Sequence, residues 1–261
     1  MSSTTGPIGH APGDILEASG LTVGAGPDAR LRGVDLRLGP GEGLGVVGRS
    51  GAGKSTLARA LVGLEPGLSG SLRFGGRELV GARRSAGAGL RARMQLVWQD
   101  PATALDPHLT IRRSLDEARV LAGRPRYGRA DPRLDALLGR VALDPELLDR
   151  APGALSGGQR QRAAIARALA AEPTWIVADE VTSALDRPVA WTIVDLLRTL
   201  RAGGIGLVMI SHDLSLLSGT VDQVLVLDGG RVVERGPVDA VLRGPRHAAT
   251  RALVDAAPRL C

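Results

Sequence analysis

The stretch GRSGAGKST, residues 48–56, contains Lys54, the only lysine among the 33 Lys and Arg residues of the chain. Its glycines, lysine and serine follow the pattern G-x-x-x-x-G-K-[ST] of a phosphate-binding loop. In such a loop, glycines let backbone N–H groups turn toward phosphate, and the compact ammonium reaches the terminal phosphates. The larger, planar guanidinium of arginine is a poor replacement there. A chain that otherwise uses arginine as its cation therefore keeps lysine where phosphate chemistry requires it.

The sequence on either side of this loop supplies the context that the pattern needs. GLGVVG, residues 43–48, predicts a buried strand, and STLARALVGL, residues 55–64, has the spacing of a helix. This order places the loop at a helix N-terminus, which favours anions. The residues expected to bind the phosphates of a nucleotide are Gly48, Ser50, Gly51, Ala52, Gly53, Lys54, Ser55 and Thr56.

Further apolar runs predict the rest of the fold. TWIVADE, residues 174–180, and IGLVMISHD, residues 205–213, are typical of parallel strands buried between two layers of helices. Residues 221–236 predict a hairpin that turns at Asp228-Gly229-Gly230. Residues 101–150 contain helical fragments and predict a helical insert. The expected fold class is α/β.

Two acidic residues end the strand predicted within TWIVADE. Asp179 is placed to hold Mg²⁺ together with the hydroxyl of Ser55. Glu180 can orient or polarise an attacking water. The structural alternative, in which both acids cap the next helix, is disfavoured in a chain that also has a phosphate-binding loop.

A second candidate anion site lies at LSGGQRQRAAIARALA, residues 155–170. Ser156, Gly157 and Gly158 open a strongly helical stretch, and this creates another helix N-terminus suited to a phosphate. Taken alone, such a start is most often a simple cap. The chain would then have two helix starts that can bind phosphate but only one phosphate-binding loop. This imbalance is explained if each nucleotide is bound between two subunits.

Composition restricts the class of protein. A length of 261 residues fits one large domain, or a core with an inserted subdomain. The one cysteine, Cys261, excludes an internal disulfide and favours a reducing, cytoplasmic setting. The net charge of +6 largely reflects the use of arginine as the cation. No apolar run is long enough to span a membrane, and residues 1–13 lack the features of a secretion signal and predict a flexible tail.

The ordered motifs resemble those of the ATP-binding-cassette (ABC) ATPases. They are GRSGAGKST, VWQDPATALDPHLTI, LSGGQRQRAAIARAL, WIVADE, TSALD and VMISHD, and the resemblance extends from about residue 14 to residue 236. It implies a P-loop, RecA-like core with an antiparallel β subdomain and a helical subdomain inserted at about residues 100–160. The implied ATPase domain is 14–245, followed by a short C-terminal tail, 246–261. The implied cofactors are ATP and Mg²⁺.

The resemblance also assigns roles to single residues. Glu180 would be the catalytic base, His212 the switch histidine at the γ-phosphate, and Lys54 a further catalytic residue. Gln99 would sense Mg²⁺ and the transport partner, and Asp186 would cross the dimer. The implied metal-binding residues are Ser55, Gln99 and Asp179. The implied signature, which closes on the ATP of a second subunit, consists of Ser156, Gly157, Gly158 and Gln159.

The motifs are most similar to those of peptide and nickel importers. VWQDPATALDPHLTI resembles their Q-loop, the P-loop region is similar to the smaller ATPase of nickel importers, and GPRHAATRALVDAAP resembles a peptide-importer tail. The implied assembly is a head-to-tail dimer with an identical or sister ATPase. It would lie at the cytoplasmic face of the membrane, bound to transmembrane permease subunits and indirectly to an external solute-binding protein, with no nucleic acid.

Two departures from the family pattern carry expectations. ABC ATPases stack adenine on an aromatic ring upstream of the P-loop, whereas no Phe, Tyr or Trp precedes Phe74 here. Because such stacking contributes on the order of 1–3 kcal/mol per base, we expect weaker ATP binding or loose discrimination between ATP and GTP. Val181 stands where proline is usual, with a small expected effect.

Other functions remain open at this point. A soluble ABC ATPase acting on nucleic acid or the ribosome fits the basic charge, but such relatives carry a long coiled coil or two cassettes. An inactive regulatory partner is disfavoured because Glu180, His212 and the signature are all present. The leading interpretation is the ATP-hydrolysing subunit of an importer, whose cargo the sequence does not name.

Overall fold

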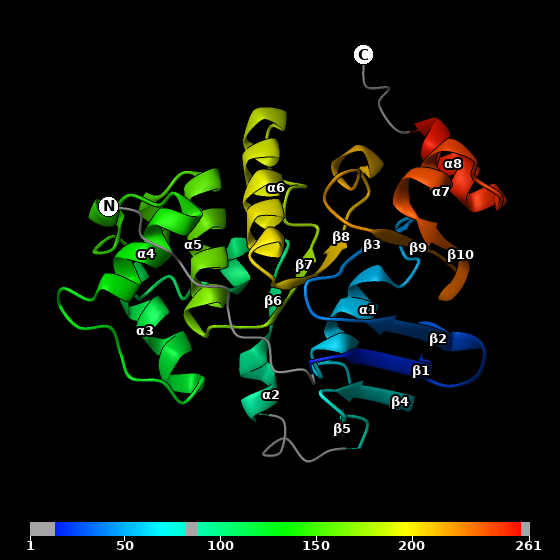
Figure 1. Cartoon of the computed structure of the whole chain (residues 1–261), viewed down its shortest axis with the longest axis horizontal. Helices are drawn as coiled ribbons and strands as arrows, with labels where there is room; N and C mark the ends of the chain where they lie inside the picture. Colours follow the sequence, from blue (N-terminus) through cyan, green and yellow to red (C-terminus); the bar gives the residue numbers. More distant parts are fainter. Residues whose placement is uncertain (1–13, 82–87, 257–261) are drawn as a thin grey trace.

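The computed structural model describes residues 14–81 and 88–256. Residues 1–13 and 257–261, which include the predicted N-terminal tail and Cys261, lie outside the described residues. The larger sheet has six strands in the order β10-β9-β3-β8-β7-β6 (Figure 1). Their bounds are Met94–Val97 for β6, Trp175–Asp179 for β7, Gly206–Ile210 for β8, Gly43–Gly48 for β3, Gln223–Asp228 for β9 and Arg231–Pro237 for β10.

All pairs in this sheet are parallel except β9 with β10. Every residue of β3, β7 and β8 is buried, as expected for strands covered on both faces. Alternate side chains of a strand face opposite sides of the sheet. Ile176 therefore packs into the hydrophobic core on one side, and Val177 packs into a second hydrophobic core on the other side. The predicted hairpin is confirmed: Asp228 pairs with Arg231, and both intervening glycines have positive φ.

A smaller antiparallel sheet packs against one face of the larger one. Its strand order is β2-β1-β4-β5, and the bounds are Leu16–Val23 for β1, Leu31–Leu38 for β2, Leu68–Phe74 for β4 and Arg77–Glu78 for β5. Helix α1, Lys54–Leu61, lies between the sheets, and its Leu57 and Leu61 share a core cluster with both. The predicted α/β fold is thereby confirmed, and the helix that follows the glycine loop is fixed between two layers.

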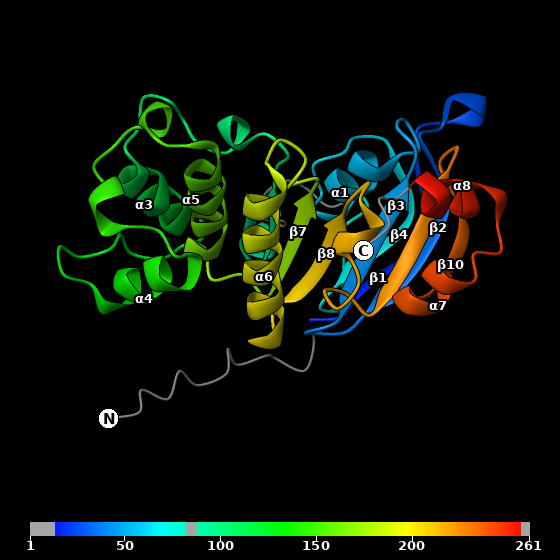
Figure 2. The same ribbon diagram turned by 90° about the horizontal axis from the view of Figure 1, so that it is seen from above.

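The remaining helices lie over the other face and at both ends of the larger sheet (Figures 1 and 2). They are α2 Ala88–Arg93, α3 Ile111–Leu121, α4 Pro132–Val141, α5 Gly157–Ala170, α6 Arg187–Ala202, α7 Val238–Arg243 and α8 Ala248–Ala256. Helices α3, α4 and α5 occupy the stretch between β6 and β7, where the sequence predicts a helical insert. Part of the predicted C-terminal tail forms α8.

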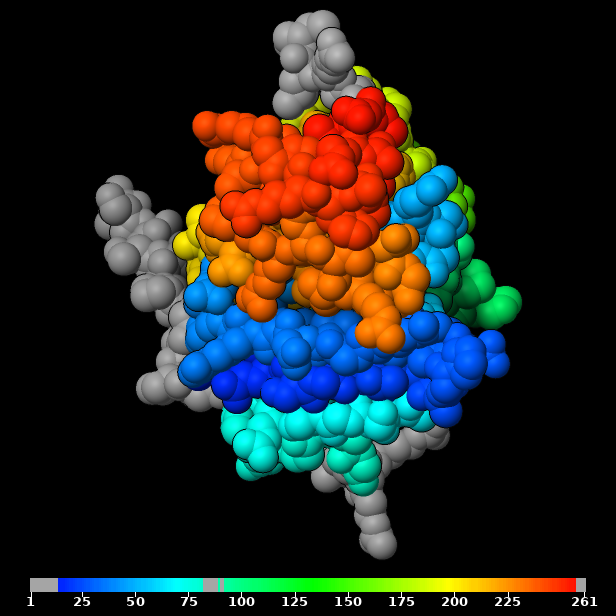
Figure 3. Space-filling model, turned by 90° about the vertical axis from the view of Figure 1, so that its right-hand side faces the viewer, coloured from blue at the N-terminus to red at the C-terminus, as the bar shows by residue number. Residues whose placement is uncertain are grey.

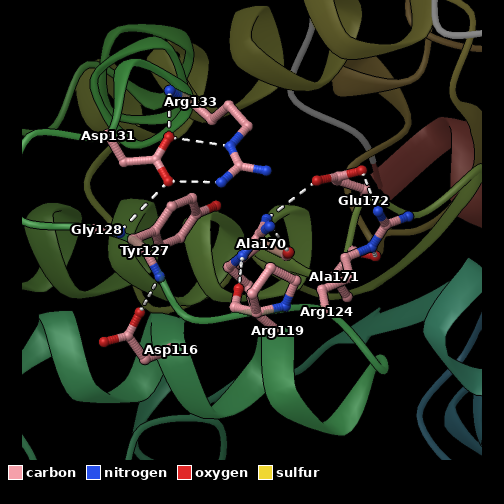
Figure 4. Close-up of polar contacts among 11 residues, drawn as sticks. Asp116, Arg119, Arg124, Tyr127, Gly128, Asp131, Arg133, Ala170, Ala171 and Glu172 are labelled. Atoms are coloured by element: carbon pink, nitrogen blue, oxygen red, sulfur yellow. Dashed lines mark hydrogen bonds and ion pairs between the residues drawn. The ribbon is translucent and has the colours of Figure 1, made fainter.

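A buried arginine ties this helical region to the strand that follows it (Figure 4). Arg119 of α3 is 1% exposed; its Nε donates to the Pro125 carbonyl at 2.7 Å, and its Nη1 lies 3.0 Å from Glu172 Oε1. Its guanidinium also lies 4.3 Å from the ring centre of Tyr127. Because Glu172 lies two residues beyond the end of α5, Arg119 fixes α3 against the connection from α5 to β7.

Replacing Arg119 by leucine is expected to lower the free energy of unfolding by about 3 kcal/mol, since it removes the donor to the Pro125 and Ala170 carbonyl groups and the cation–π contact with Tyr127. Urea unfolding monitored by circular dichroism measures this. Arg124, whose side chain is 38% exposed and pairs with the same carboxylate as Arg119, provides the matched control. Arg124→Leu should cost less than about 1 kcal/mol. Equal losses in the two variants would contradict the special role of Arg119.

Candidate functional site

The glycine loop joins the buried end of β3 to the start of α1. Gly51 and Gly53 have φ of +79° and +101°, values that favour glycine. A Cβ on Gly53 would lie 2.7 Å from the Arg30 carbonyl oxygen, and one on Gly48 would lie 2.4 Å from that of Leu227. The loop is therefore pressed against neighbouring backbone, and only glycine fits at these two positions.

The lysine of the loop is buried and has oxygen partners only. Lys54 is 7% exposed, and its Nζ donates to the carbonyl oxygens of Gly48 at 3.0 Å and Arg49 at 3.2 Å. The carboxylate of Glu180 lies 3.5 Å away. Two neutral carbonyl groups and one longer ion pair leave the ammonium able to attract a further anion in this loop.

Ser55 and Asp179 meet across the site. Ser55 Oγ donates to Asp179 Oδ1 at 3.2 Å, and Asp179 is 4% exposed at the end of β7. Burial raises the pKa of the Asp179 carboxyl, and the nearby Glu180 raises it further, whereas Ser55, Arg59 and Lys54 oppose the shift. A divalent cation placed between the hydroxyl and the carboxylate would stabilise the ionised form.

The donor set fits Mg²⁺ bound with phosphate. Within residues 14–81 and 88–256, no group of three or more His, Cys, Asp or Glu side chains could hold a metal ion by itself. A hydroxyl and one carboxylate leave most of an octahedral shell to water and substrate phosphate oxygens, which is the usual arrangement for Mg²⁺.

Glu180 occupies a strained backbone position beside the lysine. Its φ is +48°, in the left-handed region that non-glycine residues rarely adopt, and its N–H donates to the Ile210 carbonyl at 3.1 Å. Its Oε2 lies 3.8 Å from His212 Nδ1, and the His212 side chain is 62% exposed. Strained residues of this kind cluster at functional sites, and here the backbone holds the carboxylate between Lys54 and His212.

Lys54, Ser55, Glu180 and His212 line a cavity of about 670 Å³, a size that holds a nucleotide, whereas the buried Asp179 does not line it. Gln99, which donates to Ser183 Oγ at 3.2 Å, lines it together with Glu180 and His212. The loop residues that line it are Gly48, Arg49, Ser50, Gly51, Gly53, Lys54, Ser55 and Thr56. Of the predicted loop set, Ala52 is buried and does not line the cavity.

The predicted signature residues do not line this cavity. Ser156 is the N-cap of α5, where its Oγ accepts from Gln159 N at 3.3 Å and Gln159 Oε1 accepts from Ser156 N at 2.9 Å. Gly158 permits close packing, since a Cβ there would lie 2.8 Å from Val189 Cγ1. Asp186 is the exposed N-cap of α6 and forms no side-chain cap bond. Ser156, Gly157 and Asp186 are exposed.

Three lining residues were not predicted from the sequence, and one of them, Arg49, belongs to the glycine loop itself. Arg30, directly before β2, and Leu253 of α8 both line the cavity. Neither belongs to a phosphate-binding motif. The only sequence signal for Leu253 is its place in the tail that resembles peptide importers, and Arg30 has none.

Comparison with known proteins agrees with this geometry. The family described as ABC transporter matches residues 31–183. Oligopeptide transport ATP-binding protein OppF of Escherichia coli (strain K12) is 42% identical over 87% of this chain and 68% of OppF. Di/tripeptide transport ATP-binding protein DppF of Pseudomonas aeruginosa (strain UCBPP-PA14) is 39% identical over 92% of this chain and 75% of DppF. These relatives are peptide transport proteins, which agrees with the predicted resemblance to peptide importers. The predicted resemblance to nickel importers stays a prediction.

Solved structures show the same fold. The dimeric post-hydrolysis structure of the ATP-binding cassette MJ0796 bound to ADP and Pi has a TM-score of 0.75 and 26% identity, over 85% of this chain and 98% of that one. CbiO1 of Clostridium perfringens, part of the transporter complex cbiONQ, has a TM-score of 0.76 and 27% identity, over 88% of this chain and 91% of that one. The family match covers more than half of the residues, and the glycine loop, Lys54 and Asp179 lie within it. The chain belongs to the ABC transporter family.

Proposed function

We propose that the chain binds ATP with Mg²⁺ in the cavity around residues 48–56 and hydrolyses it to power a membrane permease that imports peptides. The observation that carries this proposal is the buried Lys54 ammonium, held in a glycine loop with the Ser55–Asp179 pair and Glu180 around it. The peptide transport relatives support the choice of cargo class over nickel.

The residues of the cavity have complementary tasks in hydrolysis. Water attacks the γ-phosphorus, the bond from phosphorus to the bridging oxygen breaks, and ADP leaves as the new phosphate forms. Glu180 accepts the proton of the attacking water, and Lys54 and His212 stabilise charge on the phosphate oxygens. Ser55 and Asp179 would hold Mg²⁺, with Gln99 lining the same cavity, and the ion would supply further neutralisation of phosphate charge.

A second ATPase subunit completes the site in this proposal. Ser156, Gly157, Gly158 and Gln159 lie at an exposed helix start away from the chain's own cavity, and Asp186 is also exposed. A head-to-tail partner would place its signature on this chain's nucleotide. The dimer of MJ0796 with ADP and Pi supports such an arrangement. The partner is an identical or a sister ATPase, and no nucleic acid is involved.

The permease contact is assigned to an exposed apolar patch. Among the described residues, the exposed large hydrophobic side chains are Leu64, Val120 and Leu121, and Leu121 is 70% exposed. Leu121 lines two cavities, one shared with Val120 and the other with Leu64. Apolar surface of this kind marks a protein contact. No helix in the described part of the chain is long and apolar enough to cross a bilayer, so the permease is a separate chain in this proposal.

Leu121→Asp is expected to reduce ATP-driven peptide uptake by about tenfold or more in vesicles containing the permease, because it places a charge in an apolar contact. The free energy of unfolding of the isolated chain should change by less than about 1 kcal/mol, since the side chain is exposed. Full transport with the variant would remove this patch from the permease contact.

Phosphate release tests the function as a whole. The chain, purified with its ATPase and permease partners, is supplied with ATP and Mg²⁺, and the release of phosphate is followed with and without a chelator. We expect Mg²⁺-dependent turnover. No turnover above that of a sample lacking the chain would overturn the proposal.

A further inference from the structure

The topology fixes which end of the cavity faces the nucleotide base. The glycine loop follows β3, and Glu180, His212 and Gln99 follow β7, β8 and β6, which all lie on one side of β3 in the sheet. The terminal phosphate therefore points toward that side. The other side of β3 holds β9 and β10, with α8 and the smaller sheet next to them (Figure 2). A base joined to these phosphates extends toward that second side.

Arg30 lines the cavity from the second side and is held in place at both ends. Its backbone N–H donates to the Val23 carbonyl at 2.8 Å, and its carbonyl oxygen lies against Gly53 and Gly230. Its guanidinium pairs with Glu65, a carboxylate that is only 4% exposed and also accepts from Arg59 Nε at 2.8 Å. The Arg30 side chain is nevertheless 51% exposed and lines the cavity, so its planar guanidinium is open to a ligand there.

Leu253 adds an apolar surface from a different part of the chain. Helix α8 is anchored at its start by Glu234 of β10, whose carboxylate oxygens accept from the backbone N–H groups of Arg246 and His247, each at 2.9 Å. This anchor seats the helix beside the strands next to β3. Leu253 is half-buried and reaches the cavity, whereas its neighbour Val254 does not line it. Figure 3 shows the C-terminal helices in red over the same face as the orange and blue strands.

No Phe, Tyr or Trp of the described residues lines this cavity. From the placement of Arg30 and Leu253 we infer that the purine base of the nucleotide lies on the guanidinium face of Arg30 and against the side chain of Leu253. The C-terminal helix is then part of the nucleotide site, and Glu234 is a positioning residue that acts through it. This inference rests on the proposed function, because it assumes that the phosphates occupy the loop.

Stacking on a guanidinium has a consequence for selectivity. Every base has a π face, so stacking tolerates different bases, whereas discrimination between adenine and guanine needs hydrogen bonds to base edges. The Arg30 guanidinium is paired with the Glu65 carboxylate, and Leu253 has no polar atoms in its side chain. Adenosine and guanosine nucleotides should therefore bind to this chain with affinities within about threefold of each other.

The test compares ligands with and without a base. Calorimetry measures the affinities of the whole chain for ADP and for inorganic pyrophosphate, each with Mg²⁺. Arg30→Lys keeps a charge for Glu65 but removes the flat face, and it should weaken ADP about tenfold while leaving pyrophosphate unchanged. Leu253→Ala and Glu234→Gln should weaken ADP about threefold, again with pyrophosphate unchanged.

Matched controls separate these effects from general disturbance. Arg59→Lys alters the other arginine on Glu65, and Val254→Ala alters the same helix, but neither residue lines the cavity. Both should bind ADP as the parent chain does. The proposed base site would be overturned if Arg30→Lys bound ADP as tightly as the parent chain, or if Arg59→Lys lost as much ADP affinity as Arg30→Lys. If Leu253→Ala bound ADP as tightly as the parent chain, α8 would not be part of the base site. If neither ADP nor pyrophosphate bound the parent chain, the proposed function itself would fail.

Discussion

Lys54→Arg, which conserves charge and matches the cation used everywhere else in the chain, is expected to lower ATP turnover by about 100-fold or more. The Lys54 ammonium is 7% exposed and lies between two loop carbonyl groups at 3.0 and 3.2 Å. A guanidinium is larger and planar, so it cannot take this position without opening the loop. Phosphate release by the assembled transporter at saturating ATP measures the loss.

The control for this variant is the reverse exchange at an exposed site. Arg77→Lys on β5 keeps the charge far from the loop and should leave turnover within twofold. The free energy of unfolding should be measured for Lys54→Arg as well, so that loss of folding is recognised. A folded Lys54→Arg protein with near-normal turnover would show that a point charge is not required in the loop.

Glu180→Gln is expected to reduce turnover by about 10²- to 10⁴-fold while ATP still binds. Glutamine has nearly the same shape as glutamate but cannot accept the proton of the attacking water. The substitution also removes the negative charge 3.5 Å from Lys54, so the affinity for ATP should be equal or higher. Steady-state phosphate release and calorimetry with ATP measure the two effects separately.

Different effects of the two substitutions on ATP binding distinguish the roles of Lys54 and Glu180. Lys54→Arg should weaken ATP binding together with turnover, because the ammonium contacts phosphate before and during the reaction. Glu180→Gln should affect turnover alone. Loss of ATP binding in Glu180→Gln would indicate that the carboxylate supports the loop structurally and is not the base.

The sequence predicted the elements whose signal is local. β3 covers the predicted run 43–48, β7 and β8 lie within the two later apolar runs, and the Gly229-Gly230 turn is where the hairpin was expected. Apolar runs, turn glycines and a loop motif each depend on neighbouring residues, so one chain is enough to recognise them. The predicted phosphate end of the site has the same character, since Gly48 to Thr56 are contiguous.

The base end of the site could not be predicted because it depends on packing across the fold. Arg30 and Leu253 are far apart in sequence, and only the folded chain brings both of them to one cavity. The absence of an aromatic residue before Phe74 was visible, but not what replaces it. The same is true of Arg119, whose burial follows from the meeting of α3 with the end of α5. Surface arginines and structural arginines look alike in a chain this rich in them.

A single-turnover experiment tests the central claim that Glu180 drives hydrolysis of ATP held by Lys54. The assembled transporter, in excess over γ-labelled ATP with Mg²⁺, is quenched at increasing times, and bound ATP and free labelled phosphate are separated. With the parent chain, labelled phosphate should accumulate to the amount of ATP added. With Glu180→Gln, the label should remain in bound, intact ATP. Release of labelled phosphate at the same rate in both would contradict this account.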